Sequence, residues 1–527
     1  MTTIPTASYE DLTGSPPTWS LVKSLITGLP VAAALYFLST LHLMVYENRM
    51  NLPETGMLVR LSPVGSGNSF RVTALLDERR VFFFPHQLWV AMNLMLVWGE
   101  PEPVMAPIRT LTRTEMGRLI TVLLAVTYLV DVQRLAFPED GMEYLLRHWV
   151  ALHSEPVPNR LVRWRYMLTQ SRASQKDFDL VRETFKIVTG LDVQVYFDAG
   201  LEVYAGLYDK AHRVLNGDDE WLVVEDYFHK EPAAEAVLSV CQATVADLCK
   251  QVAPYADKPQ ELLVRSRHWQ LTPVVRQGSE YFCMSLPFLA ERLSSGAHYL
   301  VLDNLRPNEK RRYMTWLGHA FEQYMLHLLS SVWMCHPEQQ EAMADVTITA
   351  PQGEVLVECK TKRIPITVFE NGDVDDFRKH LRADTGVRKG AQQLSQRFIQ
   401  IIKGTYPVGL DVCSTIPLVC TLEATPAIWH LGEEVDRVVT EFAWPVGTTP
   451  AVVSAFDLET LVAYHETTTE GIETLREWVP QRNDSTLADF LRSKRSFDWM
   501  GTFQTAQWKE ATMHASQLLN AAIYKKH

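Results

Sequence analysis

The chain has 527 residues, a formal net charge of -12, 47% hydrophobic residues and 21% charged residues. This length exceeds what one hydrophobic core supports, so two or three domains are expected, and the composition excludes a disordered or fibrous protein. Seven scattered cysteines without a Cys-x-x-Cys pair predict reduced thiols in the cytoplasm and argue against a disulfide framework or a zinc site.

Residues 24–46 are an uncharged stretch of membrane-spanning length near the N-terminus. The stretch contains Pro30, His42 and several Ser and Thr residues, and it lacks the basic flank and small-residue cleavage site of a signal peptide. We therefore predict a buried helix of a cytoplasmic protein, with a membrane helix as the alternative.

Residues 1–265 are predicted to be a mostly helical region without a recognisable set of catalytic residues. Helical periodicity occurs in four segments, at 112–135, 141–152, 176–189 and 232–251. Two apolar pieces, MLVRLSP and FRVTALLDERRVFFF, flank the turn-like VGSGNS and predict a β-hairpin. We expect this region to sense a signal, to recruit a partner protein or to form a homo-oligomer.

In residues 266–470 the sequence pattern changes to that of short strands, turns and amphipathic helices. This combination predicts an α/β domain. A helix over 312–334 carries an apolar stripe, and Glu322 lies one turn after Gly318 at the edge of that stripe. A Gly inside a helix costs about 1 kcal/mol relative to Ala, so Gly318 predicts that a neighbouring element approaches this face closely.

The stretch EVLVECKTKR, residues 354–363, is predicted to be a strand on which Glu358 and Lys360 share one face. Glu358-Cys359-Lys360 is the only place in the chain where an acid stands two residues before a Lys. A strand over 345–349 and a turn at 350–353 precede it, which predicts a hairpin that sets Asp345 beside Glu358.

A helix over 386–403 and two further strands follow, so that a crossover helix is expected to pack on a mixed sheet. Residues 360–403 contain ten Lys and Arg against five Asp and Glu, a local excess of positive charge in an acidic chain. Such an excess is typical of a surface that binds phosphate. Residues 471–527 are predicted to be a helical C-terminal tail.

These residues resemble the PD-(D/E)xK phosphodiesterase superfamily, the restriction-endonuclease-like nucleases. The resemblance covers about 310–425 and extends more weakly to about 465. The family's order of motifs is matched by LGHAFEQYM with Glu322, by Asp345, by VECK with Glu358 and Lys360, and by KGAQQL. The chain departs from the pattern where Ala344 replaces the usual Pro, and either Gln392 or Gln393 fits the family's Gln.

The resemblance implies an α/β restriction-endonuclease-like core, a mixed sheet flanked by helices, with the helical N-terminal region and C-terminal tail added to it. It implies a Mg²⁺-dependent nuclease that hydrolyses the phosphodiester bonds of nucleic acid, with DNA as the expected substrate, an endonuclease mode of action and prokaryotic defence as the setting. The alternative is a catalytically silent protein of the same shape that binds nucleic acid or acts as a scaffold.

The roles follow from the chemistry of phosphodiester cleavage, which needs a cation to neutralise the phosphate and to acidify a water. Asp345, Glu358 and Glu322 are expected to hold Mg²⁺, with Mn²⁺ as the alternative ion. Lys360 is expected to contact the attacking water or the phosphate, and Gln393 to orient one of them. Flanking phosphates are expected to bind at four basic residues, Lys362, Arg363, Arg388 and Lys389.

Overall fold

The computed structural model divides into two compact units, one of residues 1–139, 199–296 and 519–527 and one of residues 140–198 and 297–518. The boundaries expected near residues 265 and 470 fall inside these units. The structure describes residues 6–46, 52–135, 155–170, 175–221, 223–224, 232–263, 265–338, 343–383, 386–425, 429–448 and 450–524. The helix expected at 141–152 lies outside the described residues.

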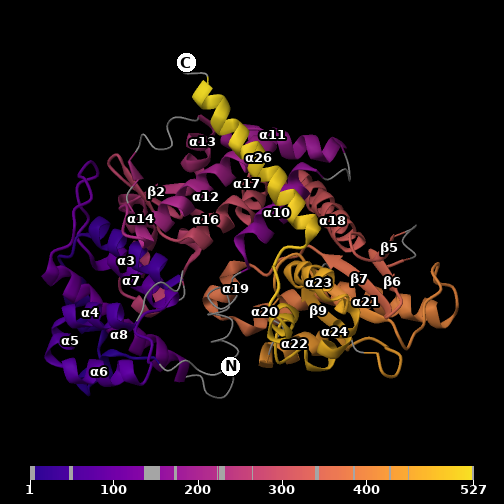
Figure 1. The fold of residues 1–527 in the computed structure, drawn as a ribbon, viewed down its shortest axis with the longest axis horizontal. Coiled ribbons are helices and arrows are strands. Elements are labelled where there is room, and N and C mark those ends of the chain that lie inside the picture. Colours follow the sequence, from indigo (N-terminus) through magenta and orange to yellow (C-terminus); the bar gives the residue numbers. More distant parts are fainter. Residues whose placement is uncertain are drawn as a thin grey trace. The chain divides into compact units, whose positions relative to one another are not determined.

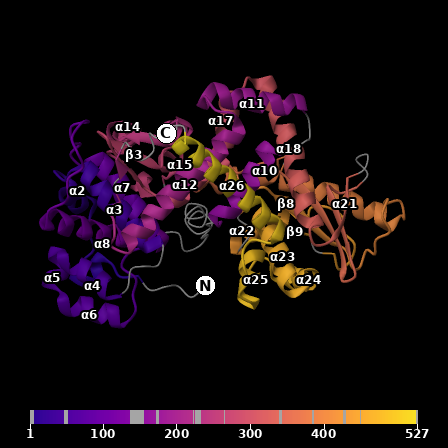
Figure 2. The same ribbon diagram turned by 45° about the horizontal axis from the view of Figure 1, so that its top comes forward.

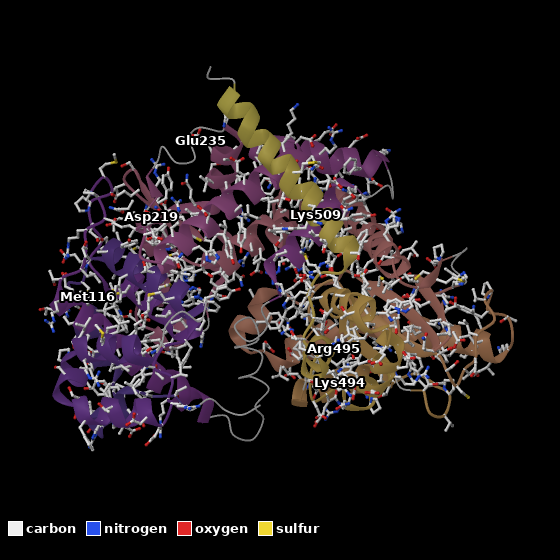
Figure 3. The ribbon with its side chains drawn as sticks, in the orientation of Figure 1. Met116, Asp219, Glu235, Lys494, Arg495 and Lys509 are labelled. Atoms are coloured by element: carbon white, nitrogen blue, oxygen red, sulfur yellow. The ribbon has the colours of Figure 1, made fainter. Side chains whose placement is uncertain are left out.

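The first unit is mostly helical, as expected for the N-terminal region. Its helices are α1 (Tyr9–Thr13), α2 (Trp19–Ile26), α3 (Val31–Tyr46), α4 (Leu52–Leu61), α5 (Pro63–Gly67), α6 (Ser69–Asp77), α7 (Pro85–Trp98), α8 (Arg113–Leu135), α12 (Val193–Leu215, shared with the second unit), α13 (Pro232–Cys241), α14 (Val245–Val252), η2 (Ala253–Tyr255), η3 (Pro259–Leu263), α15 (Arg267–Leu271) and α16 (Leu286–Leu293). Asp219, which is labelled in Figure 3, follows α12 in the chain. It forms an ion pair of 3.0 Å with Lys210 of that helix.

A small mixed sheet also belongs to the first unit, with the strand order β1-β4-β3-β2. Its strands are β1 (Val223–Val224), β2 (Gln242–Thr244), β3 (Val274–Gln277) and β4 (Glu280–Cys283). The single helix expected over 232–251 is therefore wrong in its middle, because Gln242–Thr244 pairs in parallel with β3. That partner lies some thirty residues further along the chain, where local periodicity cannot reveal it.

The uncharged stretch at 24–46 contains the end of α2 and all of α3, which lie on either side of Pro30. Most side chains of α3 are buried, which confirms the expectation of a buried helix. Among the described residues, no helix combines the length and the apolar character that crossing a membrane requires.

The β-hairpin expected between residues 57 and 84 is wrong, because this segment forms α4, α5 and α6. The buried residues Val72 and Leu75 are three apart, as on a helix, while Phe70 is 86% exposed. Ser62 caps α5 by accepting a hydrogen bond from Gly65 N, so a Ser-Pro pair begins a helix here instead of a turn between strands.

The second unit contains the sheet that carries the predicted site (Figures 1 and 2). Its helices are α10 (Val157–Thr169), α11 (Gln175–Thr189), α17 (Ser295–Leu302), α18 (Pro307–Ser330), α19 (Ile366–Asn371), α20 (Val374–Leu381), α21 (Val387–Ile402), α22 (Trp429–Val439), α23 (Ala455–Thr468), α24 (Gly471–Trp478), η4 (Val479–Gln481), α25 (Leu487–Lys494) and α26 (Thr502–Tyr524). Its strands are β5 (Met334–Pro337), β6 (Val346–Ala350), β7 (Gly353–Lys360), β8 (Ile416–Thr421) and β9 (Ala451–Ser454).

The five strands of the second unit form a mixed sheet in the order β5-β6-β7-β8-β9. β5, β6 and β7 are antiparallel neighbours, whereas β8 and β9 continue the sheet in parallel. The crossover from β7 to β8 contains α21, which packs against both strands. The expected mixed sheet with a crossover helix is confirmed, and so is the helical character of the C-terminal residues.

β7 is the central strand, and it is buried on both faces. Leu356 joins a core with Val419 and with residues of α21 and α22. Val355 and Val357, which point the other way, are also fully buried, and α18 packs against β6 and β7. The charged residues Glu358 and Lys360 therefore come at the end of a strand that is otherwise hydrophobic core.

All seven cysteines are free. Cys359 of β7 and Cys420 of β8 are buried neighbours in the parallel pair. Burial raises the pKa of both thiols, so they behave as small apolar residues.

Candidate active site

The β6–β7 hairpin brings Asp345 beside Glu358, as the sequence predicts. Val346 pairs with Val357, so the next position along the ladder sets Asp345 opposite Glu358 on one face. Asp345 Oδ2 accepts a hydrogen bond of 2.6 Å from the backbone N–H of Cys359. The hairpin register and this hydrogen bond fix the separation of the two carboxylates.

Lys360 lies between the two acids. Its Nζ donates to Glu358 Oε2 at 3.1 Å and to the Cys359 carbonyl at 3.0 Å, and it is 3.7 Å from Asp345 Oδ2. The Lys360 side chain is 12% exposed, whereas Glu358 is fully buried. The three charged side chains thus form a largely buried cluster, in which Glu358 is the most deeply buried.

Two acids share one ammonium in this cluster, and the pKa of Glu358 reflects that shortage of positive charge. Burial raises the pKa of Glu358 well above its ordinary value, and the nearby Asp345 raises it further, against the opposing effect of Lys360. Burial by itself lowers the pKa of Lys360, but Glu358 and Asp345 outweigh burial and raise it. At neutral pH Lys360 is therefore charged, while Glu358 favours its protonated form.

Glu322 reaches the same cluster from α18. Burial raises the pKa of Glu322 to about 7, and repulsion from Asp345 adds to this, while Lys360 opposes it. The helix α18 packs against β6 and β7, so Glu322 comes from a helix that covers the strands of the cluster. Lys360 contacts both Glu358 and Asp345, and the charges of Asp345 and Lys360 act on the pKa of Glu322.

The explanation offered for Gly318 is wrong. A Cβ placed on Gly318 would meet no described atom within 4 Å, so no neighbour approaches this helix face. The glycine that does permit close packing is Gly390 on α21. Its Cβ would lie 2.8 Å from Val419 Cγ1 and 3.3 Å from Lys360 Cε, so any larger residue would press on the side chain of Lys360.

The two candidate glutamines, Gln392 and Gln393, differ in their position around the helix α21. At 100° per residue, Gln393 lies within about 60° of Gly390 around the helix, whereas Gln392 lies about 160° away. Gln393 Oε1 is buried and has no hydrogen-bond partner among the described residues. Gln393, named from the sequence, is thus on the side of the helix that faces Lys360.

The basic residues expected to bind flanking phosphates fall into two groups. Arg363 pairs with Glu423 and stacks on Tyr299, and its side chain is only 13% exposed. Arg388 pairs with Glu441 at 2.9 Å. Lys389 is exposed and Lys362 is half-buried, so these two are the more accessible cations.

Three residues near the cluster were not singled out from the sequence: Glu338, Arg397 and Tyr406. Arg397 lowers the pKa of Glu358 and therefore lies near it, and Glu338 helps to raise the pKa of Glu322. The Tyr406 hydroxyl contacts Thr347 Oγ1 at 2.7 Å and accepts from Ala344 N at 3.1 Å. One available signal was that Arg397 follows Gln393 by one helical turn in QLSQR.

The acids have the chemistry of a Mg²⁺ or Mn²⁺ site, since these ions prefer carboxylate oxygens. Glu358 Oε1 is buried and without a hydrogen-bond partner in the described part of the chain, and a cation would satisfy it. The described residues include no group of three or more His, Cys, Asp or Glu side chains already arranged around one ion. Lys360 supplies the positive charge in this arrangement instead.

Comparisons with known proteins returned no relatives. No protein-family model matches the chain, and no curated protein and no solved structure matches it either.

Proposed function

We propose that the second unit is a metal-dependent nuclease that hydrolyses phosphodiester bonds, with DNA as the substrate to test first and a PD-(D/E)xK-type core as its fold. The observation that carries this proposal is the convergence of Asp345, Glu358 and Lys360 at the end of β7. Their spacing along the chain, their shared face and the approach of Glu322 from α18 all agree with that chemistry.

In this mechanism Asp345, Glu358 and Glu322 are the residues that would hold Mg²⁺ or Mn²⁺. When bound, the ion acidifies a water and neutralises charge on the phosphate. The N–H of Cys359 fixes the carboxylate of Asp345 by a hydrogen bond, and Glu358 would hold the ion in its deprotonated form.

Lys360 is the positioning and proton-holding group. Its ammonium group lies at the end of β7 beside both acids, and its N–H groups would donate to the phosphate oxygen on which negative charge builds. Gly390 leaves room for this side chain against α21, and Gln393 on the same side of the helix offers a neutral amide that orients the water without adding charge.

A second function is favoured by one specific observation, the ion pair of 3.1 Å between Lys360 and Glu358. A lysine that neutralises the acids permanently would leave the protein a nucleic-acid-binding or scaffolding module with no catalysis. The two functions differ in one property, because only the nuclease needs a divalent cation.

The test is incubation of the full-length protein with supercoiled plasmid DNA, and separately with RNA, in Mg²⁺, Mn²⁺ or EDTA. We expect cleavage only with the metal, and loss of cleavage in Lys360→Ala and Glu358→Gln. Glu354→Gln is the matched control, since Glu354 lies on the same strand and accepts a hydrogen bond from Ser414, away from the cluster. Binding without cleavage under every condition would favour the scaffolding function.

A further inference from the structure

Arg397 is a buried cation on the side of α21 that faces the site. It follows Gly390 by seven residues, which places it within about 20° of Gly390 around the helix. The residue is 7% exposed and its side chain 9% exposed. A Cβ on Gly390 would lie 3.3 Å from Lys360 Cε, so this side of α21 faces the acidic cluster, and the Arg397 charge lowers the pKa of Glu358.

The guanidinium of Arg397 has few partners for so buried a group. An arginine carries five N–H donors, and burying them without acceptors costs free energy. Arg397 Nε is buried and has no hydrogen-bond partner, and the side chain makes no hydrogen bond to the described residues. Its ion pair with Glu338 spans 3.9 Å from Nη2 to Oε1, at the outer limit of such a contact.

Two glutamines on the same side of α21 share this property. Gln393 and Gln400 each have a buried Oε1 with no hydrogen-bond partner among the described residues. A half-turn of either amide would present its NH₂ group in place of the oxygen. Three consecutive turns of the helix therefore carry buried polar atoms without a partner among the described residues, and of these the Arg397 Nε is the donor.

We propose that Arg397 binds a non-bridging oxygen of the phosphodiester that enters the site beside Lys360. The inference rests on the proposed function only in taking the anion to be the phosphate of nucleic acid. A phosphate group supplies the acceptors that the guanidinium lacks, and Arg binds it in a two-pronged geometry that Lys cannot reproduce. The ion pair between Glu338 and the guanidinium is long and therefore weak, so the phosphate replaces Glu338 as the partner of Arg397.

The competing explanation is that Arg397 is only a structural cation, present to neutralise Glu338 and Glu358. The two explanations predict opposite effects for Glu338→Gln. If the ion pair with Glu338 is what matters, Glu338→Gln weakens the protein as Arg397→Met does. If Arg397 binds phosphate, Glu338→Gln removes a competitor and tightens binding.

The experiment measures binding of a labelled random-sequence DNA duplex to the full-length protein across a salt series, with Ca²⁺ in place of Mg²⁺. We expect Arg397→Met to lower affinity by about tenfold to a hundredfold and to reduce the salt slope by about one. Arg397→Lys keeps the charge and recovers the slope but only part of the affinity. The matched control is Arg437→Met, an exposed arginine of α22 whose partner Glu434 keeps a second arginine.

Inorganic phosphate provides a second readout that is independent of nuclease activity. We expect it to raise the thermal midpoint of the wild type and of Glu338→Gln, but not of Arg397→Met. If the wild type cleaves DNA and Arg397→Met binds and cleaves as the wild type does, the inference is overturned while the nuclease function stands. If phosphate stabilises the protein through Arg397 yet no nucleic acid is cleaved with any metal, the anion site stands and the nuclease function fails. Parallel losses in Arg397→Met and Glu338→Gln would establish the structural role and overturn the inference.

Discussion

The phenol oxygen of Tyr406 accepts a hydrogen bond of 3.1 Å from the backbone N–H of Ala344, the residue just before Asp345. In the family that this chain resembles, a proline without an N–H is usual at that position. Ala344 has an N–H that is buried at the start of β6, and a buried donor without an acceptor is costly. Tyr406 satisfies it and so fixes the backbone that carries Asp345.

Replacing Tyr406 by Phe tests this anchor. We expect Tyr406→Phe to destabilise the protein by about 1–2 kcal/mol and to lower the rate of cleavage more than the apparent affinity for DNA, because Asp345 loses its fixed position. Thr347→Val is the matched control, since it removes the contact of the same hydroxyl with Thr347 and leaves Ala344 satisfied. Equal losses of activity in both variants would contradict the anchor at Ala344.

The two helical glycines near the site predict opposite outcomes for the same substitution. Gly390→Ala puts a methyl group 2.8 Å from Val419 and 3.3 Å from Lys360, so we expect cleavage to fall at least tenfold as Lys360 is displaced. Gly318→Ala meets no described atom within 4 Å, and it should stabilise α18 by about 0.5–1 kcal/mol with cleavage unchanged. Thermal melts and plasmid cleavage on both variants check this. Loss of cleavage in Gly318→Ala would show that something does fill that space.

Lys360→Met leaves two buried acids without a counter-ion, and its cost depends on pH. A carboxyl whose folded-state pKa is raised contributes stability below its unfolded pKa and loses it as pH rises through the folded value. Lys360 stabilises Glu358 only when that carboxyl is ionised, and burial raises the pKa of Glu358 to about 8, so the deficit in thermal midpoint relative to the wild type should be small at neutral pH and grow above about pH 8. The double variant Lys360→Met, Glu358→Gln should lose most of this pH dependence. A deficit that stays constant with pH would contradict the coupling.

The first unit should lose stability in acid through its buried histidines. Burial lowers the pKa of His268 to about 3 and those of His42 and His86 to about 4. A histidine with a lowered folded pKa contributes stability above about pH 6.5, and the stability falls by about 1.4 kcal/mol per pH unit below that. His268→Gln should reduce the slope of stability against pH in acid by the contribution of one histidine, about 1.4 kcal/mol per pH unit. An unchanged acid profile in this variant would show that His268 is not titrating in the unfolding transition.

The parts of the fold that were predictable from sequence are those set by local pattern. The hairpin over 345–360 has alternating β-branched residues and a Pro-Gln-Gly turn, and the helix over 386–403 has one apolar face, so both were recognisable. The strands β2 and β5 were not, because both are short, β2 pairs with a strand some thirty residues further along the chain, and β5 begins at the last residue of the expected helix. The helix expected to reach residue 334 ends at Ser330, and β5 begins at Met334.

The site was predictable only as far as its motif. Asp345, Glu358 and Lys360 could be named because their spacing on two strands determines their positions. Arg397 could not, since an arginine in a basic stretch is normally exposed, and only the packing of α21 against β7 shows that it is buried. Conversely, Arg363 looked like a surface cation but is occupied by Glu423 and Tyr299.

The two-residue turn between Ala350 and Gly353 has a consequence for how this chain tolerates insertions. The length of the turn fixes the ladder, so it also decides which residue of β6 stands opposite Glu358. One extra amino acid in the turn would shift the pairing of β6 with β7 by one residue. Asp345, some five residues away from the insertion, would then lie on the opposite side of the sheet. The same slip would turn the buried side chains of Val346 and Ile348 away from the core, so the length of this turn is a condition of the fold as well as of the candidate site.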